Sequence, residues 1–466
     1  MRNYQIEMEN ELAGIRERGF RPLLVLHACC APCSSAVLER LNRDFRIVIF
    51  FYNPNIAPKT EFTRRADEEE RLVREMGLRD IEVVRGEYDA EAFYAAIRGH
   101  ENDPEGGERC GICFRLRLET AARFARKIGA DYLTTSLTIS PLKNAERLNT
   151  IGWAAAEKYG VKWLYSDFKK KNGYARSIEL SRVYALYRQD YCGCVFSGRE
   201  AEDRRAARLD IEKARSGLRE GDIGCEIEHH EQIDSTNNRA KELAVAGAPH
   251  GTVVLADRQT AGRGRFARHF YSPDKAGIYM SVVLRPQIAP ERAVMITTMA
   301  AVAVARAMER VADVRAEIKW INDVYLNGKK ACGILCEAGM DMQAGKLNYV
   351  VMGIGINVGR MCFPPELENT ATSLSNACGR AVARTDFLSA LLRELTDLWP
   401  KLDSAEILRE SRDRSIVIGR DVRVIRGEEQ FTARATDIDA DGSLIVETPD
   451  GHTFSLHSGE VSLKLN

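Results

Sequence analysis

Short apolar runs separated by longer charged segments set the pattern of the first half of the chain. The apolar runs are 23–27 (LLVLH), 46–51, 81–85, 131–135 and 162–165. The segments between them are rich in charge and show helical spacing. Short buried strands that alternate with helices are typical of a parallel sheet with helices on both faces. We therefore predict a doubly wound α/β domain with parallel strands.

The second half shows another α/β pattern, which ends in short alternating strands. We expect strands at Thr252–Ala256 and Ala316–Asn322, with a hairpin turn at Asn327-Gly328. From residue 415 to the end, short strands alternate with Asp-Gly turns. Such spacing is typical of a small β-barrel. This half is therefore predicted to form an α/β domain followed by a small barrel.

A charged segment between the halves marks the expected domain boundary. It runs from Arg199 to Gly221, has few apolar residues, and suits a solvated helical linker. With 466 residues the chain exceeds the size at which a single core keeps growing, so two or three domains are expected. The predicted divisions are 1–198, a linker at 199–224, 225–412 and 413–466.

The charge balance and the N-terminal pattern exclude some classes of protein. Lysine and arginine together number 67, as do aspartate and glutamate, so the net charge is zero. This balance excludes a uniformly basic nucleic-acid coat and leaves room for a local basic groove. The segment Met1–Gly19 alternates charged and apolar residues and lacks the continuous apolar core of a signal peptide or membrane span. We expect a cytoplasmic protein with no membrane partner.

Seven of the 12 cysteines fall into three tight clusters, which indicates a metal or redox site. The clusters are Cys29, Cys30 and Cys33, then Cys110 and Cys113, then Cys192 and Cys194. Two C-x-x-C pairs supply the four thiolates of an iron–sulfur or zinc centre. A disulfide framework would need an oxidising compartment, for which the sequence gives no sign. The first cluster is expected in the loop between the apolar run at 23–27 and a helix beginning at Ser34, where parallel sheets bind ligands.

Several motifs of the first half resemble the QueH-type epoxyqueuosine reductases. They are HACCAPC at 27–33, NPNI at 53–56, CGICFRLRL at 110–118, SLTISPLKN at 136–144 and DFKKKNGYARSIELSRVYALYRQDYCGCVFS at 167–197. The similarity spans about residues 20–198. It implies reduction of epoxyqueuosine, a modified base at the wobble position of tRNA, to queuosine, with the epoxide oxygen lost as water.

The resemblance also implies a [4Fe-4S] cluster as the source of electrons. Cys110 and Cys113 are the expected cluster ligands, together with two of the three cysteines Cys29, Cys30 and Cys33. The thiolate left over is available to a second iron or to the substrate. An iron with an open position would act as a Lewis acid on the epoxide oxygen.

Two alternatives stay open around the third cysteine cluster. Cys192 and Cys194 form either a redox-active pair or part of a second metal site, and an unidentified electron donor is implied. Basic and aromatic residues precede them: Lys169, Lys170, Lys171, Arg176, Arg182, Arg188, Tyr174, Tyr184, Tyr187 and Tyr191. This mixture can neutralise phosphates and stack on splayed bases, but an amphipathic helix with core tyrosines would show the same pattern. The resemblance favours tRNA.

A set of motifs in the second half resembles the BirA-type biotin protein ligases. They are DSTN at 234–237, RQTAGRGR at 258–265, AEIKWINDVYLNGKKACGIL at 316–335 and YVVMGIGINVG at 349–359. The similarity covers about residues 228–464. It implies condensation of biotin with ATP to biotinyl-5′-adenylate, followed by transfer of the biotinyl group to a lysine of a biotin carboxyl carrier protein.

The resemblance assigns the biotin head group and the adenylate to two sets of residues. The set expected to hold the head group is Ser235, Thr236, Asn237 and Gln259. The loop expected to order over the adenylate is formed by Gly262, Arg263, Gly264 and Arg265. Its backbone N–H groups and guanidinium groups can surround a phosphate. The same DSTN motif is expected to open a helix with Thr236 as its cap.

Lys330 is the residue expected to contact the biotin carboxyl and the α-phosphate, and it is the expected catalytic residue beside Arg263 and Arg265. Asn322 and Asp323 are candidates for contacts to the nucleotide and Mg²⁺. One departure from the family pattern is Ile321, where a proline is usual. The final segment matches the SH3-like domain that ends this family. The reductase half takes the place of the winged-helix module that some members carry, so no operator DNA is expected as a partner.

Three other interpretations compete with this one. The first half could be a zinc-containing nucleic-acid-binding module, although the clustered cysteines exceed the four thiolates that zinc prefers. It could also be a sulfur-transferring tRNA enzyme, which would use a cluster as well. The second half could be a lipoate ligase, which shares the fold of the biotin ligases.

Overall fold

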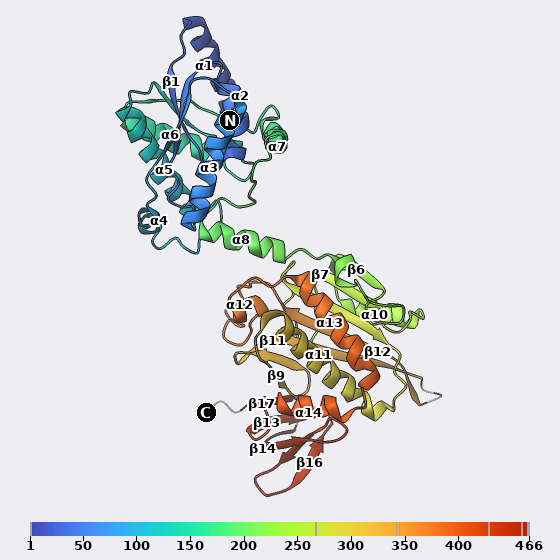
Figure 1. Ribbon diagram of the computed structural model, residues 1–466. Helices are drawn as coiled ribbons and strands as arrows, with labels where there is room; N and C mark the ends of the chain where they lie inside the picture. The colour runs from blue at the N-terminus through green and yellow to red at the C-terminus, as the bar shows by residue number, and fades with distance from the viewer. Residues whose placement is uncertain are drawn as a thin grey trace. The chain divides into compact units, whose positions relative to one another are not determined.

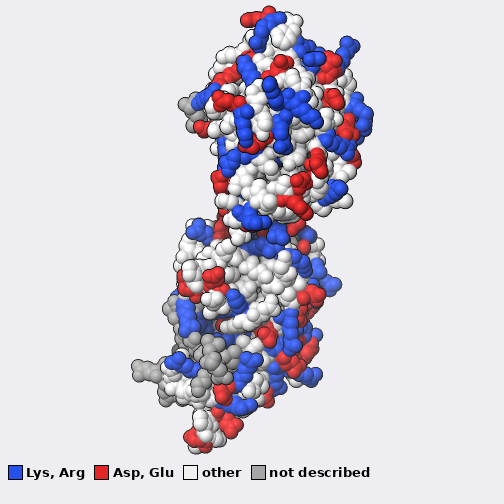
Figure 2. Space-filling view, turned by 90° about the vertical axis from the view of Figure 1, so that its left-hand side faces the viewer, with Lys and Arg blue, Asp and Glu red and all other residues white. Residues whose placement is uncertain are grey.

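The computed structural model describes residues 2–265, 268–341, 343, 345–426, 429–457 and 460–463. The chain divides into two compact units, Met1–Ala201 and Glu202–Asn466. Among the described residues, no helix combines the length and the apolar character needed to cross a bilayer. Lysines and arginines share the visible surface of each unit with aspartates and glutamates (Figure 2), so neither unit shows a coat of one sign on that face.

The first unit is an α/β domain on a five-stranded sheet with the order β3-β2-β1-β4-β5. Its elements are α1 (Tyr4–Arg18), β1 (Leu23–His27), α2 (Ala31–Leu41), β2 (Arg46–Phe51), α3 (Lys59–Met76), β3 (Ile81–Arg85), α4 (Ala90–Ala96), α5 (Glu108–Lys127), β4 (Tyr132–Thr135), α6 (Ala145–Lys158), β5 (Lys162–Trp163) and α7 (Gly173–Val183). All neighbouring strands are parallel. The parallel sheet is confirmed, and β1, β2 and β3 have the predicted bounds.

Helices cover both faces of this sheet (Figure 1) because the side chains of its strands alternate between two apolar layers. On β1, Leu24 and Leu26 pack with apolar residues of α1 and α2. Val25, between them, packs with residues of α5 and α6 on the opposite face. A sheet buried on both faces needs nearly continuous apolar strands, which explains the unbroken runs in the sequence.

The second unit contains two sheets. The larger is a seven-stranded mixed sheet with the order β6-β7-β8-β12-β11-β10-β9, and the smaller is a five-stranded antiparallel sheet with the order β16-β15-β14-β13-β17. The elements around the larger sheet are β6 (Ile227–Ile233), α10 (Thr236–Val245), β7 (Val253–Gln259), β8 (Gly277–Leu284), α11 (Val294–Ala312), β9 (Ala316–Lys319), β10 (Asp323–Leu326), β11 (Lys329–Asp341), β12 (Lys346–Asn357), α12 (Leu374–Cys378), α13 (Arg384–Leu398) and α14 (Ala405–Asp413). The smaller sheet comprises β13 (Asp421–Arg426), β14 (Glu429–Ile438), β15 (Leu444–Glu447), β16 (Thr453–Leu456) and β17 (Glu460–Leu463).

The predicted hairpin and the antiparallel C-terminal strands are both present. β10 pairs with β11 in antiparallel register across Asn327 and Gly328, whose φ angles of 50° and 75° are those of a type I′ turn. The paired strands of the smaller sheet are all antiparallel within the described residues. Its closure into an SH3-like barrel stays a prediction.

The charged segment at 199–224 differs from the solvated linker that we expected. It begins inside α8 (Val195–Ala206) and continues through α9 (Ile211–Ala214). The backbone N–H of Asp210 donates to Thr385 Oγ1 at 2.9 Å. Ala214 and Ile223 are buried in the core of the second unit. The few apolar residues of this segment pack there, so its later part belongs to that unit.

Candidate functional sites

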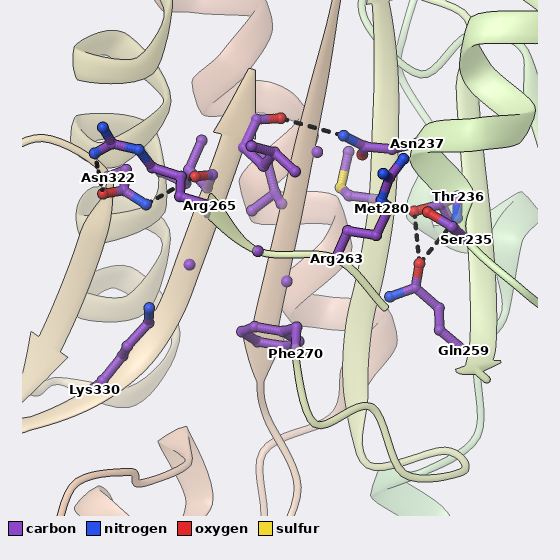
Figure 3. Close-up of a pocket in the computed structure, with 17 residues that line it drawn as sticks. Ser235, Thr236, Asn237, Gln259, Arg263, Arg265, Phe270, Met280, Asn322 and Lys330 are labelled. Atoms are coloured by element: carbon purple, nitrogen blue, oxygen red, sulfur yellow. Dashed lines mark hydrogen bonds between the residues drawn. The ribbon is translucent and has the colours of Figure 1, made fainter. Parts of the chain in front are cut away.

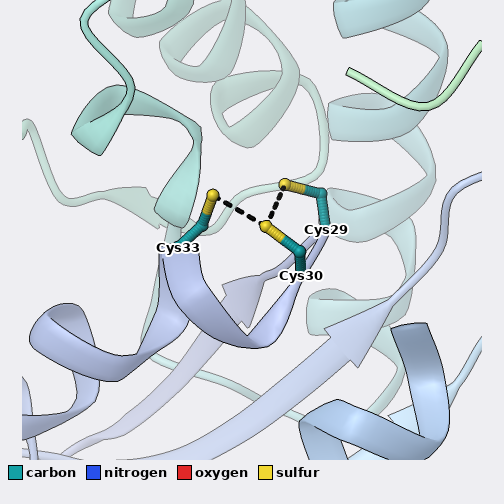
Figure 4. A group of neighbouring side chains, drawn as sticks. All are labelled: Cys29, Cys30 and Cys33. Atoms are coloured by element: carbon teal, nitrogen blue, oxygen red, sulfur yellow. Dashed lines mark hydrogen bonds between the residues drawn. The ribbon is translucent and has the colours of Figure 1, made fainter. Parts of the chain in front are cut away.

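Three thiols lie together at the carboxyl end of β1. The sulfurs of Cys29, Cys30 and Cys33 all lie within 4.8 Å of one another, and the Cys30 and Cys33 sulfurs are 2.8 Å apart (Figure 4). Hydrogen bonds from the other two thiols hold the pKa of Cys29 well below its usual range. Three sulfurs at this spacing can share one metal ion or one cluster.

The position of Cys33 corrects the sequence expectation. It lies in the first turn of α2, which begins at Ala31 rather than near Ser34. Cys30 is the N-cap residue, and Pro32 stands in the first turn, where the fixed φ of proline suits a helix start. The loop therefore contains Cys29 and Cys30, and the helix aims Cys33 back toward them.

Cys110 and Cys113 lie outside this group of three, on the first turns of α5. The Arg147 guanidinium holds that helix start by donating to the carbonyls of Gly106 and Gly107, both at 2.9 Å. Burial raises the pKa of Cys110, and it raises that of Cys113 to about 12. Both thiols lie one turn apart near the start of the helix, and burial favours their neutral form.

Cys192 and Cys194 face different surroundings. Cys192 lines a cavity of about 330 Å³ that also exposes the three thiols, and its sulfur is 3.4 Å from Lys143 Nζ. Cys194 is 7% exposed and packs with Phe93 and Cys113. Gly193 between them has φ of +122°, and a Cβ there would lie 2.9 Å from a side-chain carbon of Ile56. Glycine at this position lets the chain pass close to the segment that precedes α3.

Buried cations surround the thiols, and sequence reasoning missed them. Arg117 is fully buried, and its guanidinium donates to the neutral Asn53 Oδ1 and lies against the Cys113 thiol. Among the described residues, its Nε and Nη1 have no oxygen or nitrogen acceptor. Burial works to lower the pKa of Arg117, but the thiols of Cys113 and Cys29 outweigh burial and raise it. A buried guanidinium without a carboxylate partner fits an anionic group such as metal-bound thiolates.

Arg65 and Lys143 extend this positive lining. The Arg65 side chain is 1% exposed, pairs with Glu61 at 2.7 Å and donates to the Cys192 carbonyl at 3.0 Å. Burial works to lower the pKa of Lys143, yet Cys192 and the carboxylate of Glu105 raise it above its usual range. The donor set of the site, thiols beside buried cations, therefore suits an anionic metal centre.

The predicted basic and aromatic residues separate into two groups. Tyr174, Arg188 and Tyr191 line the cavity. The cations Lys169, Lys171 and Arg176 instead pair with Asp167, Glu9 and Glu39 respectively. α7 covers only residues 173–183, so one amphipathic helix does not account for the whole stretch. The cavity has a size typical of small-molecule sites.

In the second unit, one pocket collects most of the predicted ligase residues (Figure 3). Those that line it are Ser235, Thr236, Asn237, Gln259, Arg263, Gly264, Arg265, Asn322 and Lys330. In Figure 3, Lys330 and Arg265 lie on one side, Ser235, Thr236 and Gln259 on the other, and Phe270 between them. Two predicted residues are absent from the lining: Gly262 and Asp323.

The start of α10 presents polar groups to this pocket. Ser235, not Thr236, is the N-cap residue, with extended φ and ψ of −155° and 126°. Thr236 is the first helical residue, and its N–H and hydroxyl both donate to Gln259 Oε1, at 2.9 and 3.1 Å. The Gln259 Nε2 in turn donates to Ser272 Oγ at 3.3 Å. The Thr236 side chain therefore orients Gln259 rather than capping the helix.

The Gly-Arg-Gly-Arg loop contacts both sides of the pocket. The Arg263 guanidinium donates to Asn238 Oδ1 at 3.1 Å, and that of Arg265 donates to Asn322 Oδ1 at 3.2 Å. Gly262 does not have a positive φ. A Cβ there would lie 2.8 Å from the Phe270 carbonyl oxygen, so glycine is needed for close approach.

A second cavity adjoins the first and contains Asp323. The two cavities share lining residues, among them Arg265, Asn322 and Lys330. Lys330 Nζ is 2.7 Å from Asp323 Oδ1. The peptide bond between Trp320 and Ile321, just before this site, is cis. A carboxylate, two cations and an amide thus stand where the two cavities meet, which suits a phosphate with a divalent cation.

Family comparisons divide the chain in two. Residues 24–200 match the family Epoxyqueuosine reductase QueH. Residues 230–357 match the Biotin/lipoate A/B protein ligase family, and residues 417–464 match the Biotin protein ligase C terminal domain.

Individual proteins show the same division. Epoxyqueuosine reductase QueH of Staphylococcus epidermidis is 42% identical over 206 residues, which cover 42% of this chain and 87% of that protein. Bifunctional ligase/repressor BirA of Bacillus subtilis is 36% identical over 308 residues, which cover 65% of this chain and 88% of that protein. Among solved structures, the biotin protein ligase from Aquifex aeolicus in complex with biotin and ATP matches with a TM-score of 0.45 at 27% identity, covering 52% of this chain and 100% of that chain.

Proposed function

The chain belongs to the QueH family through its first half and to the BirA-type biotin protein ligases through its second, and we propose that it combines both activities. The first half reduces epoxyqueuosine in tRNA to queuosine. The second half joins biotin to a lysine of a carrier protein through biotinyl-5′-adenylate.

The observation that carries the reductase proposal is the group of three thiols at the end of β1, which shares a cavity with Cys192 and lies beside buried cations. Cys110, Cys113 and two of the three thiols at the end of β1 hold a [4Fe-4S] cluster, and the remaining thiol is free for a second iron or the substrate. When bound, such a centre supplies electrons and a Lewis-acidic iron. Arg117 balances the negative charge of the thiolates. The C-x-x-C pair on α5 is held for this task by Arg147.

The epoxide oxygen leaves as water, so the reaction consumes two electrons and two protons. Oxidation of Cys192 and Cys194 to a disulfide releases the same number of each, which balances one reduction. Cys192 is the member that faces the substrate cavity, and the Lys143 ammonium stabilises negative charge on its sulfur. Cys194, packed away from the cavity, is the partner that closes the disulfide. An external donor then restores the dithiol.

The tRNA substrate meets the cavity at a rim of exposed apolar and basic side chains. Tyr174 is 36% exposed and Leu142 is 66% exposed, and both line the opening. The Arg188 guanidinium lies 6.0 Å from the centre of the Tyr174 ring. A phenol ring with an arginine over it can stack on a splayed anticodon base and neutralise a neighbouring phosphate.

The reductase proposal is tested on the full chain purified anaerobically. We expect broad visible absorbance, bound iron and sulfide, and conversion of epoxyqueuosine to queuosine by mass analysis of tRNA nucleosides. Replacing Cys110 and Cys113 with alanine should abolish the absorbance, and a full cluster in that variant would show that our ligand assignment is wrong. Bound zinc without iron would favour the nucleic-acid-binding module, and thiolated nucleosides would favour sulfur transfer.

The observation that carries the ligase proposal is the convergence of the head-group residues, the arginine loop and Lys330 on one pocket. Adenylation joins a carboxylate to a phosphate, so cations from two directions are needed to offset the repulsion. Lys330 supplies one, and Arg263 and Arg265 supply the others. Asp323, beside Lys330, and Asn322 are placed for Mg²⁺ and the nucleotide.

The C-terminal sheet takes part in the ligase site in this proposal. Val461 of β17 lines the cavity that contains Asp323, and Trp320 Nε1 donates to the Gly442 carbonyl at 3.0 Å. The sheet is the SH3-like domain of the family. The test of the ligase is ATP-dependent adenylation and transfer with biotin and with lipoate, supplied in parallel. Transfer of lipoate in preference to biotin would replace the proposal by its alternative.

A further inference from the structure

Asn237 in the ligase pocket is held by groups from two strands of the larger sheet. It lies in the first turn of α10, is 4% exposed and lines the pocket. Its amide nitrogen is 2.8 Å from Glu337 Oε2 and 3.4 Å from the Leu335 carbonyl oxygen. Its amide oxygen accepts from Ser281 Oγ at 2.6 Å. All of these partners come from strands β8 and β11 beneath the helix.

The chemistry of these partners fixes which way the Asn237 amide points. An ionised carboxylate and a carbonyl oxygen can only accept hydrogen bonds, so the NH₂ group must face Glu337 and Leu335. Both amide hydrogens are then used. Ser281 occupies one of the two lone pairs on the amide oxygen. Asn237 therefore retains only acceptor capacity, and a ligand can bind it only by donating a hydrogen.

Glu337 is itself anchored on the side away from the pocket. Its other oxygen, Oε1, forms an ion pair with Lys241, which lies one turn after Asn237 on α10. Burial acts to raise the pKa of Glu337, but the hydrogen bonds from Lys241 and Asn237 outweigh it and lower the pKa. The carboxylate is thus ionised at neutral pH. Glu337 is not among the residues that line the pocket, so it acts through Asn237.

The Asn237 amide oxygen is closely packed, so the side chain has little room to change its position. A Cβ on Gly353 would lie 2.0 Å from Asn237 Oδ1. The strand therefore passes directly against the amide, and glycine at 353 makes room for it. Because Gly353 also lines the pocket, the amide oxygen lies at the pocket wall.

We propose that Glu337 is a positioning residue that fixes Asn237 as a hydrogen-bond acceptor and so selects ligand heads that carry an N–H donor. The inference rests on the proposed ligase function. A cyclic urea such as the biotin head offers N–H groups, whereas the dithiolane of lipoate offers none. A dithiolane would leave the Asn237 lone pair without a partner in a dry pocket, which is unfavourable. The contact with Asn237 therefore favours biotin over lipoate, the two ligands named in the family that residues 230–357 match.

The test compares Glu337→Gln with wild type in the full chain. Glutamine can donate as well as accept, so the Asn237 amide is free to turn over and present NH₂ to the ligand. We expect the dissociation constant for biotin to rise about ten- to a hundred-fold, the size of one buried polar mismatch. The kcat of adenylation at saturating biotin and the KM for ATP should stay near the wild-type values. The matched control is Glu242→Gln, an exposed carboxylate on the same helix that pairs with Arg239.

A second readout separates positioning from mere support of the fold. Biotin methylated at a ureido nitrogen lacks one N–H donor, so wild type should discriminate strongly against one of the two methyl isomers. That discrimination should shrink in Glu337→Gln while the thermal unfolding midpoint stays within a few degrees. Unchanged discrimination in a folded variant would overturn the inference. Failure of the wild-type chain itself to bind biotin would instead overturn the proposed ligase function.

Discussion

Lys330 joins the two cavities of the ligase site at the scale of a single side chain. Its ammonium contacts Asp323 and is exposed enough, at 35%, to reach a ligand in either cavity. Lys330→Ala should slow formation of biotinyl-5′-adenylate roughly ten- to a hundred-fold, because a charged hydrogen bond contributes about 1.5–3 kcal/mol. Pyrophosphate exchange measures this step. The control is Lys329→Ala, because the Lys329 ammonium donates to the Glu368 carbonyl at 2.8 Å instead of contacting Asp323. Adenylation by Lys330→Ala at the wild-type rate would show that Lys330 has no role in this step.

Cys192 and Cys194 differ in surroundings, and this difference gives a residue-scale prediction about the reductase. Our ligand count needs neither thiol for the cluster. Serine at both positions should therefore leave iron content near wild type while reduction of epoxyqueuosine is lost. Iron analysis and nucleoside mass analysis on the same preparation check this. Loss of the whole cluster in that variant would make the two thiols primary ligands.

Single residues also show how far the sequence could go. The cysteines and the Gly-Arg-Gly-Arg loop are visible in the sequence because their chemistry is concentrated in short stretches. Arg65, Arg117 and Lys143 are not, because each is one ordinary cation within a charged segment and gains meaning only from burial beside distant thiols. Glu337 was missed for the same reason: it lies in a strand and is 100 residues from the amide that it orients.

At the scale of an element, the start of α5 depends on a glycine inside its C-x-x-C motif. A Cβ on Gly111 would lie 2.0 Å from an Arg147 guanidinium nitrogen. Arg147 cannot move away freely, because it also pairs with Glu108 at 2.7 Å. Gly111→Ala should therefore loosen the helix start, lower iron occupancy and slow reduction. The control is Gly14→Ala, because a Cβ at Gly14 would meet open space. Gly129→Ala is not used as a control because Gly129 has a positive φ. Full iron occupancy in Gly111→Ala would contradict the role given to Arg147.

The arginine loop gives a second prediction at this scale. Arg265 ties the loop to Asn322 across the pocket, so the loop is placed to close over the adenylate once it forms. Arg265→Ala should weaken retention of the adenylate more than binding of biotin, because a less secured loop admits water and releases the reactive anhydride. The measurements are the amount of free adenylate released and the biotin labelling of a non-cognate protein, detected by streptavidin blotting. Arg258→Ala is the control. Release and labelling equal to wild type would refute the lid role.

Element bounds were predictable where one physical effect dominates. The parallel strands of the first unit are buried on both faces, so their apolar runs coincide with β1, β2 and β3. Helix starts were less predictable. At α2 and α10 the caps are Cys30 and Ser235, and neither makes a side-chain capping bond. Without that bond the local signals, Pro32 and the DSTN motif, mark each start only approximately, and the contacts of Thr236 with Gln259 are set by the tertiary structure.

At the scale of the whole molecule, the two sites draw on separate stretches of the chain. The thiols and their cations lie between residues 29 and 194, and the ligase pockets are lined by residues from Ser235 onward. Each stretch has its own sheet and core. A metal centre that binds only the folded unit stabilises that unit, because binding shifts its unfolding equilibrium toward the native state.

Removal of iron from the full chain should therefore affect one unit only. Treatment with a chelator under reducing conditions should abolish epoxyqueuosine reduction and lower the unfolding temperature of the first unit, because its buried Arg117 then loses the anionic centre that it faces. Biotin adenylation and transfer should continue at the wild-type rate, since none of the seven clustered cysteines is among the described residues that line the two ligase cavities. Calorimetry combined with both activity assays on one preparation makes the comparison direct. A matching fall in biotinylation after iron removal would show that the two activities are coupled, and would replace the independent-unit account with one in which the reductase centre regulates the ligase.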